Sequence, residues 1–241
     1  MLRAAAICPL ALLLMACGIT NPLASQRTST PRPSGAIAQG GGTGGSNSAA
    51  PSGTLTVDKA GFGGATSSGF EFWDAGAIVT NHSDKLAAMH VAVQATATDA
   101  AGQTVGTGST SVSYIRPGQS FPVAVNLQAT SAPAKVTVLA AAQSWGPDSS
   151  TQYPGAVITG TGILVKPTGS QYYVNATLNS TYPADLTNVV AFAVCTDASG
   201  NISAAAESFV QLLPARGQTG VQFIEYGAAP ASCQVVGVPS G

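Results

Sequence analysis

Short apolar runs broken by turn residues recur along most of the chain, and many of them alternate between apolar and polar positions. The clearest case is residues 89–98, where the apolar positions are Val91, Val93, Ala95 and Ala97 and the polar ones are His90, Gln94, Thr96 and Thr98. A period of two residues is typical of a β-strand with one buried face. No long stretch has the 3.6-residue apolar period of an amphipathic helix. The chain is therefore predicted to be all-β.

One phrase occurs twice, as "TDAAGQ" in residues 98–103 and as "TDASGN" in residues 196–201. At the same offset of 98 residues, Asn81 aligns with Asn179 and Val91 aligns with Val189. The chain is therefore interpreted as a tandem duplication. Its first unit has about seven apolar runs, the number of strands in an immunoglobulin-like sandwich. These runs span residues 55–57, 70–73, 77–80, 89–98, 109–115, 121–127 and 136–142. We expect two tandem immunoglobulin-like β-sandwiches, in residues 54–149 and 150–241.

Each copy of the repeated phrase is predicted to be the turn of a β-hairpin. An aspartate can accept a hydrogen bond from its own backbone two residues on, and a glycine can adopt the positive φ that begins the next strand. A calcium site at Asp99 and Asp197 is the alternative. It requires further oxygen ligands, and each turn contains only one acidic residue.

The N-terminus has the features of an export signal, with Arg3 followed by an apolar run too short to span a membrane. The run ends in Leu-Met-Ala-Cys at residues 14–17, which resembles the lipobox of bacterial lipoproteins. That resemblance implies that residues 1–16 are removed and that Cys17 is acylated, for example with palmitate, and anchors the protein in a membrane. Gly18 follows it rather than Asp, which by the family's sorting rule does not retain the protein in the inner membrane. An ordinary secretory signal cleaved nearby is the alternative.

Residues 17–53 are rich in Gly, Ser, Thr, Pro and Ala and have almost no large apolar side chains. Such a segment cannot bury a core, so it is predicted to be an unstructured tether. A flexible coil of this length has a root-mean-square span of roughly 30–35 Å. We expect it to hold the folded part away from the membrane.

Low charge is the most unusual feature of the composition. Only 8% of the 241 residues are charged, against roughly 25% in an ordinary soluble chain. The formal net charge is −1 and the sequence has no basic cluster. This pattern excludes an electrostatic surface for nucleic acid.

The order of motifs in each unit is similar to that of bacterial FxLYD-type domains, which are small β-sandwiches of exported proteins. Each unit has an Asn in a short loop, an alternating strand, Asp-x-x-Gly and a second alternating strand, and residues 117–119 of the first add Pro-Gly-Gln. The resemblance covers residues 76–127 and 174–225. At the motif itself only Asp99 and Asp197 match the family.

The cysteines agree with export. Cys8 leaves with the signal and Cys17 carries the lipid, so that Cys195 and Cys233 remain in the second unit. We expect a disulfide between these two in an oxidising compartment. Two reduced, buried thiols are the alternative.

No catalytic, metal-binding or cofactor-binding motif is present. His82 and His90 are the only imidazoles, and Glu71, Glu207 and Glu225 are far apart in the sequence. We therefore expect a non-enzymatic protein without a cofactor. An envelope hydrolase is the alternative, and it requires acidic, His or Ser side chains that converge in one cleft.

With nucleic-acid binding and catalysis set aside, the sequence predicts binding to another molecule. Residues 189–195 are apolar on both faces of their strand, so that Val190 and Phe192 require a cover: the other sandwich, the C-terminal segment of the same unit, or a partner protein. Trp73, Trp145 and Tyr153 are candidate exposed rings. We expect a lipid-anchored envelope protein with a structural or protein-binding role, and a carbohydrate-binding role as the alternative.

Overall fold

Antiparallel strands make up most of the structure, a computed structural model that describes residues 52–169 and 171–240. The all-β prediction is confirmed. The described residues also contain one short 3-10 helix, η1 (Asp148–Ser150), and no helix among them is long and apolar enough to cross a membrane. The strands are β1 (Leu55–Ser67), β2 (Phe70–Asn81), β3 (Leu86–Thr98), β4 (Thr104–Ile115), β5 (Ser120–Ala129), β6 (Lys135–Pro147), β7 (Ile158–Thr168), β8 (Gln171–Ser180), β9 (Leu186–Thr196), β10 (Ile202–Leu213), β11 (Gln218–Tyr226) and β12 (Ser232–Pro239).

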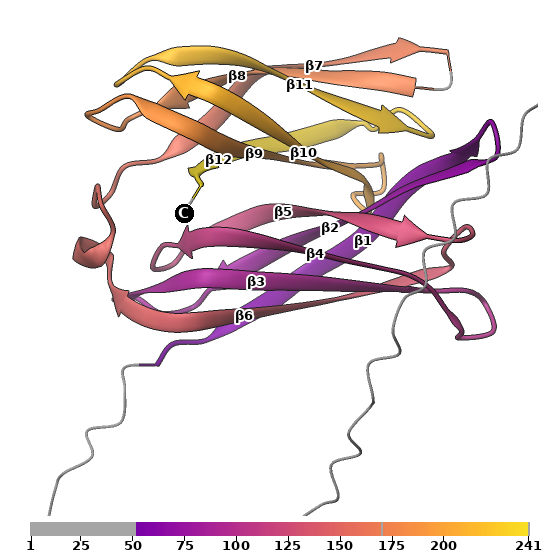
Figure 1. Cartoon of the computed structure of the whole chain (residues 1–241), viewed down its shortest axis with the longest axis horizontal. Helices are drawn as coiled ribbons and strands as arrows, with labels where there is room; N and C mark the ends of the chain where they lie inside the picture. The colour runs from indigo at the N-terminus through magenta and orange to yellow at the C-terminus, as the bar shows by residue number, and fades with distance from the viewer. Residues whose placement is uncertain (1–51, 170, 241) are drawn as a thin grey trace, which may run out of the picture. The chain divides into compact units, whose positions relative to one another are not determined.

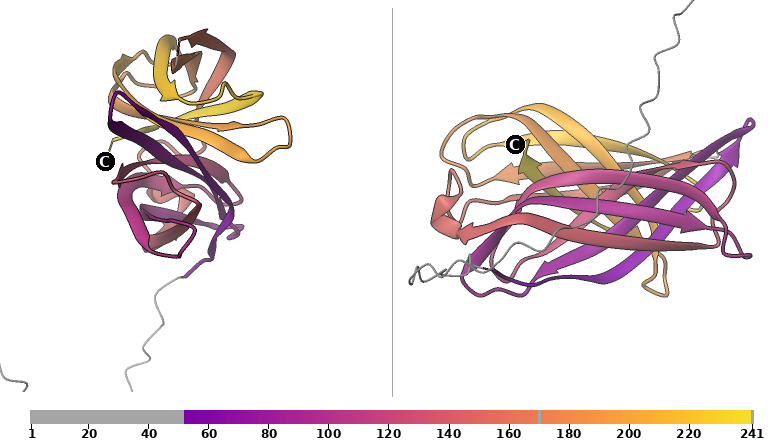
Figure 2. Two further views of the ribbon diagram at one scale, coloured as in Figure 1. Left: turned by 90° about the vertical axis from the view of Figure 1, so that its right-hand side faces the viewer. Right: turned by 60° about the horizontal axis from the view of Figure 1, so that its bottom comes forward.

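The strands form two six-stranded antiparallel sheets, which we call the first body (β1 to β6) and the second body (β7 to β12) (Figure 1). The strand order is β1-β2-β5-β4-β3-β6 in the first and β10-β9-β12-β7-β8-β11 in the second. Each sheet folds over on itself, so that β1-β2-β5 faces β4-β3-β6 and β7-β8-β11 faces β10-β9-β12. Seen end-on, each body is a β-sandwich that is nearly closed into a barrel (Figure 2).

Each body has six strands, fewer than the seven runs expected from the sequence. The runs at residues 70–73 and 77–80 belong to one strand, β2. The residues between them, Asp74 to Gly76, pair with Val125 and its neighbours on β5 without a break in register. The prediction of a turn there is wrong because nothing interrupts the ladder.

The duplication is visible in the backbone. Left-handed φ values recur at the offset of 98 residues, at Gly102 (79°) and Gly200 (80°) and at His90 (47°) and Asn188 (54°). Non-glycine residues seldom adopt positive φ, so the matched positions of His90 and Asn188 point to a common backbone plan in the two bodies.

The repeated phrases form hairpin turns, as predicted. Asp99 Oδ1 accepts hydrogen bonds from the backbone amides of Ala101 (2.9 Å) and Gln103 (2.8 Å). Asp197 repeats this arrangement in the second body. Each aspartate side chain therefore stabilises the turn in which it lies. The part of the chain described here holds no group of three or more His, Cys, Asp or Glu side chains able to bind a metal ion.

The two bodies differ in which strands close the fold. In the first body the two layers are joined where β4 pairs with β5, at Gly106↔Ala129. In the second body they are joined where β12 pairs with β7, at Val236↔Thr159. The counterparts of β4 and β5 are β10 and β11, which lie at the two ends of the second sheet and are side by side without being ladder neighbours. We call the boundary between β10 and β11 the open seam.

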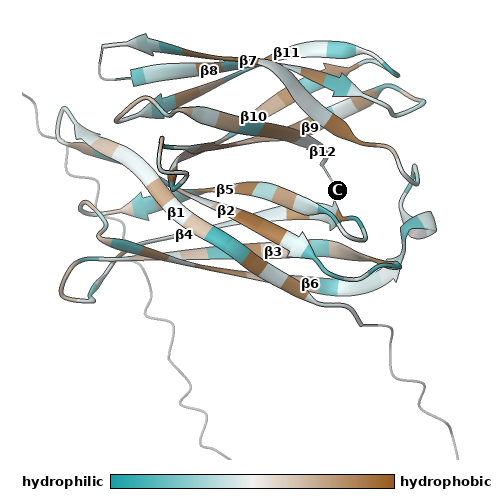
Figure 3. Ribbon diagram, turned by 180° about the vertical axis from the view of Figure 1, so that it is seen from behind, coloured by the Kyte–Doolittle hydropathy of each residue, from teal (hydrophilic) through white to brown (hydrophobic). Residues whose placement is uncertain are grey.

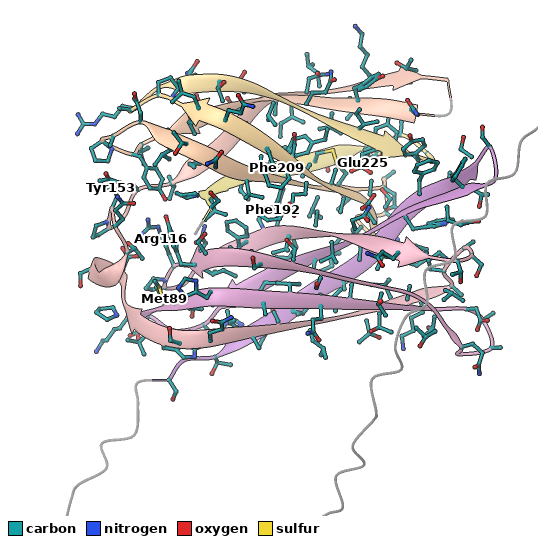
Figure 4. All side chains as sticks on the ribbon, in the orientation of Figure 1. Met89, Arg116, Tyr153, Phe192, Phe209 and Glu225 are labelled. Carbon is teal, nitrogen blue, oxygen red and sulfur yellow. A yellow bond between two sulfur atoms is a disulfide. The ribbon has the colours of Figure 1, made fainter. Side chains whose placement is uncertain are left out.

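The first body covers the outer face of β9. Phe192 and Val194 are 0% and 2% exposed and belong to the same hydrophobic core as Phe121 and Ala124 of β5. The rings of Phe121 and Phe192 meet edge to face, with centroids 5.9 Å apart. Figure 3 shows hydrophobic stretches on β2 and β9, on either side of this junction, and Figure 4 places Phe192 between the two bodies. The apolar second face of residues 189–195 is thus covered by the other sandwich.

Glycines on the first body allow this close approach. A Cβ at Gly63 would lie 1.8 Å from the carbonyl oxygen of Ser203, and a Cβ at Gly76 would lie 2.8 Å from Cγ2 of Ile202. Since real Cβ atoms do not come so near, the backbones of β1 and β10 are in contact only because residue 63 has no side chain.

Substitution of Gly63 with alanine is therefore expected to separate the bodies locally and to lower the free energy of unfolding by about 2 kcal/mol, the usual cost of overpacking. Urea denaturation followed by tryptophan fluorescence measures this change. Gly220→Ala on β11 is the control, because its Cβ would meet nothing within 4 Å. Equal losses in the two variants would contradict the close-packing argument.

Arg116, at the end of β4, ties the linker between the bodies to the first body. Arg116 is 8% exposed, and its guanidinium pairs with the carboxylate of Asp148 and donates to the carbonyl oxygens of Tyr153 (3.0 Å) and Ala156 (2.6 Å). It also lies 4.9 Å from the centre of the Tyr114 ring. Figure 4 shows Arg116 and Tyr153 together at the end of the molecule where the chain crosses between the bodies. One side chain thus binds a carboxylate and two carbonyl groups of the crossing.

Replacing Arg116 with alanine removes the guanidinium partner of the Asp148 carboxylate, which keeps the Gly155 amide as a donor, and leaves two carbonyl groups without the Arg116 donor. We expect a loss of about 3 kcal/mol in the free energy of unfolding, as when one partner of a largely buried ion pair is removed. Thermal unfolding at neutral pH measures the loss. The exposed Arg216 provides a matched Arg→Ala control, which should stay within about 0.5 kcal/mol of the parent.

Candidate functional site

A cleft of about 390 Å³ opens between the two bodies. The first body contributes one wall and the second body the other. The lining residues are Asp74, Ser109, Thr110 and Asn126 from the first body and Ala206, Glu207, Phe209 and Ile224 from the second. Ligand sites are frequently found where two domains or sheets meet. We call this feature the inter-sheet cleft.

Strand alternation brings Asp74 to the cleft. Its neighbours Ala75 and Ala77 are buried in the first core, so Asp74 and Gly76 point away from that core, toward the second body. Asp74 is opposite Asn126 of β5, whose Nδ2 donates to Asp74 Oδ1 at 3.1 Å. The antiparallel register therefore fixes one carboxylate and one amide side by side on this wall.

A hydrogen bond crosses the cleft from one body to the other. Thr110 Oγ1 on β4 donates to Glu207 Oε2 on β10 at 3.0 Å. Phe209, two residues further along β10, is 69% exposed, and Ile224 of β11 is 52% exposed. The second wall thus combines one carboxylate with an apolar rim.

A buried carboxyl lies behind the open seam. Glu225 of β11 is 2% exposed, on the same face of its strand as the core residues Val221 and Phe223. Its Oε1 atom has no hydrogen-bond partner, and neither has the hydroxyl of Tyr172, which is directly opposite on β8. Buried polar groups are nearly always hydrogen-bonded, so these two unpartnered atoms are an unusual feature of the second core. Figure 4 shows Glu225 in the second body.

The carboxyl groups of this region influence one another. Burial, and then the charge of Asp74, raise the pKa of Glu225 to about 9. Burial also raises the pKa of Asp74 to about 6, although the hydrogen bond from Asn126 opposes this. Burial and the nearby carboxylates raise the pKa of the Tyr172 hydroxyl. At neutral pH Glu225 is therefore protonated and Asp74 is mostly ionised. Strongly shifted groups of this kind gather at functional sites.

A larger polar trough adjoins the cleft on the first body and shares Ser109 and Asn126 with it. Its volume is about 500 Å³. The remaining lining residues are Gln94, Ala95, Thr96, Thr107, Gly108 and Gln128. The cleft therefore continues onto a surface of amides and hydroxyls.

The expected disulfide is present. Cys195 and Cys233 are bonded and stand opposite each other on β9 and β12. In the first body the pair Ala97↔Val136 takes the corresponding place. The disulfide therefore stabilises the second body alone. Cys17, with the predicted signal peptide and most of the predicted tether, lies outside the described residues.

The three candidate rings are not free surface rings. Trp73 is half-buried; its Nε1 donates to Glu71 Oε2 at 2.5 Å, and its ring centroid lies 6.1 Å from that of Phe62. Trp145 packs against the first core. Tyr153 packs against the second core, with its ring 5.6 Å from that of Tyr182.

Neither Val190 nor Phe192 is a free surface residue. Phe192 is fully buried between the bodies and Val190 is half-buried at the edge of the same core. Two strongly exposed rings are instead those of Phe70 (67%) and Phe209 (69%), neither of which the sequence analysis singled out as a binding ring.

The sequence did not reveal the cleft, because its lining residues come from five strands that are far apart in the chain. One signal was available in the sequence. Glu225 follows Val221 and Phe223 on the apolar phase of its strand, and a carboxylate in a core position is unusual. The two imidazoles are elsewhere: His82 Nε2 lies 2.8 Å from Thr56 Oγ1, and His90 lines a separate pocket with Ser111 and Gln143.

Comparison of the sequence with models of known protein families gives no match, and comparison with curated proteins gives none either. The resemblance to FxLYD-type domains remains an expectation from the sequence.

Proposed function

We propose that this protein is a lipid-anchored, non-enzymatic binding module of the bacterial cell envelope and that the inter-sheet cleft is its ligand site. The lipobox-like residues 14–17 and the tether composition support the anchor and the exported location. The disulfide between Cys195 and Cys233 agrees with an oxidising compartment.

The observation that carries the binding role is the cleft itself. It is walled by two sheets that share one core, so the two walls are held in a fixed relation. A preformed concave site with a few convergent polar groups and an exposed aromatic ring is the usual form of a binding site. A partner protein of the envelope fits the apolar rim formed by Phe209 and Ile224.

Two measurements test the proposal. Intact mass of the membrane-extracted protein should give an N-terminus at Cys17 with added acyl mass, and a soluble chain with an unmodified N-terminus would contradict the anchor. A photo-crosslinking amino acid at Ser109, in the cleft, should capture a partner in intact cells. The same probe at Ser199, on the exposed β9–β10 turn, is the control, and equal capture at both positions would contradict the role of the cleft.

An envelope hydrolase is the second candidate, because Asp74 and Glu207 converge in one cleft with Glu225 close behind it. Two neighbouring carboxyl groups whose pKa values differ, as those of Asp74 and Glu225 do, can act as general acid and general base. Turnover of cell-wall or glycan substrates that is lost in Asp74→Asn and kept in Glu71→Gln would favour this candidate over the binding module. A carbohydrate-binding role through Trp73 and Trp145 has less support, because neither ring is free.

A further inference from the structure

Two hydrogen-bond donors in the inter-sheet cleft are already used within the protein. Asn126 Nδ2 donates to Asp74 and Thr110 Oγ1 donates to Glu207. A carboxylate has about four acceptor positions, so both acidic side chains keep acceptors that the protein does not fill. The residues lining the cleft include no Lys, Arg or His. The cleft is therefore an acceptor-rich, negatively charged site without a cation of its own.

The unpartnered carboxyl of Glu225 is a second, independent sign of a missing partner. Ile224 lines the cleft, and its neighbour Glu225 points to the opposite, core side of β11, so the buried carboxyl lies behind the cleft wall. The carboxyl is also close enough to Asp74 for that charge to affect it. Glu225 is neutral at pH 7, and its ionisation beside Asp74 is costly unless a positive group compensates the two charges.

The chemistry of the rim indicates what kind of cation fits. The described residues offer no group of three acidic, His or Cys side chains able to bind a metal ion. Phe209 and Ile224 stand beside the carboxylates, 69% and 52% exposed. An aromatic face and an apolar side chain suit an alkyl stem that ends in a guanidinium or ammonium group. A guanidinium has five donors and no acceptor, which matches the unfilled acceptors of the cleft.

We propose that the inter-sheet cleft binds an arginine or lysine side chain of a partner protein, with Asp74 and Glu207 accepting hydrogen bonds from the cationic head and Phe209 packing on its stem. This inference rests on the proposed function, because it names the ligand chemistry of that module. The exposed apolar rim of Phe209 and Ile224 favours a polypeptide over a small free cation.

Binding of a cation is linked to proton release. The titratable groups that face Glu225 are Asp74 of β2 and Tyr172 of β8, with Glu207 of β10 on the cleft wall. A bound cation favours the ionised carboxylates. Since the pKa of Asp74 is about 6 and that of Glu225 is about 9, the affinity is expected to rise between pH 6 and pH 9.

Isothermal titration of the full-length, membrane-extracted protein in neutral detergent tests the inference. The probes are a blocked Ala-Arg-Ala tripeptide and the same peptide with citrulline, a neutral isostere, in place of arginine. We expect the arginine peptide to bind at least about tenfold more tightly, as one charge-assisted hydrogen bond would give. Asp74→Asn and Glu207→Gln should each remove that advantage. Glu71→Gln, on the same strand as Asp74 but hydrogen-bonded to Thr66 and Trp73 outside the cleft, should keep it.

Several results would overturn the inference. Equal binding of the two peptides, or no binding of either at millimolar concentration, would show that the cleft does not select a cation. Spermidine binding as tightly as the arginine peptide would overturn the assignment to a protein side chain, and displacement of the peptide by a neutral oligosaccharide would assign the cleft to a glycan. A negative titration together with crosslinking from Ser109 would leave the binding module standing and remove only the cationic ligand.

Discussion

Replacement of Glu225 with glutamine is expected to make the protein more stable at neutral pH. The folded protein raises the pKa of this carboxyl from 4.5 to about 9. Folding therefore favours the protonated form, and the native protein loses stability as the pH rises from the unfolded pKa toward the folded one. At 1.36 kcal/mol per pKa unit, the cost is about 3 kcal/mol at pH 7 and about 6 kcal/mol at pH 9. Glutamine keeps the shape and removes the charge, so the variant should gain these amounts.

Urea denaturation at pH 4, 7 and 9 measures this effect. At pH 4 both proteins carry a neutral side chain at residue 225 and should have nearly equal free energies of unfolding. The parent should then weaken as the pH rises, whereas Glu225→Gln should weaken much less. Glu71→Gln should follow the parent at every pH. A parent protein with the same stability at pH 4 and pH 9 would contradict the assigned burial of Glu225.

Loss of the disulfide is expected to lower the free energy of unfolding by about 4 kcal/mol. The bridge joins residues that are 38 positions apart, and closing a loop of that size restricts the unfolded chain by about this amount in the chain-entropy model. The first body supplies the design of the variant, because it has Ala97 opposite Val136 in the corresponding place. The double substitution Cys195→Ala and Cys233→Val reproduces that pair and preserves an apolar contact between β9 and β12.

The double variant is compared with the parent protein in both its reduced and its oxidised form. The double variant and the reduced parent protein should unfold at similar urea concentrations, both well below the oxidised parent. If the reduced parent is much less stable than the double variant, the loss reflects poor packing of free thiols rather than chain entropy. Equal stability of all three forms would contradict a stabilising role for the bridge.

Local features were predicted well from the sequence. The alternation in residues 89–98 gives the strand β3, and the repeated Asp-x-x-Gly gives two hairpin turns of one geometry. The apolar second face of residues 189–195 required a cover, and the first body provides it. These features depend on periods and turn chemistry that act over a few residues.

The cleft depends on contacts that no local pattern encodes. Asp74 affects the pKa of Glu225 only because β2 packs against β10 of the second body, and Arg116 joins Asp148 only because the linker folds back on β4. The sequence also does not indicate which strands close each body. Two related sequences close at β4–β5 in one body and at β7–β12 in the other. Small differences in side-chain packing decide between such alternatives, and they are spread over both sheets.

The open seam has a consequence for amide hydrogen exchange. In the first body the junction of β4 and β5 is held by ladder hydrogen bonds, whereas β10 and β11 only touch. Amides of β10 and β11 that face this boundary should therefore exchange with solvent faster than those at the equivalent boundary of the first body. A ligand that bridges the two strands should slow them selectively. Exchange rates at this one boundary would thus report occupancy of the cleft before the ligand itself has been identified.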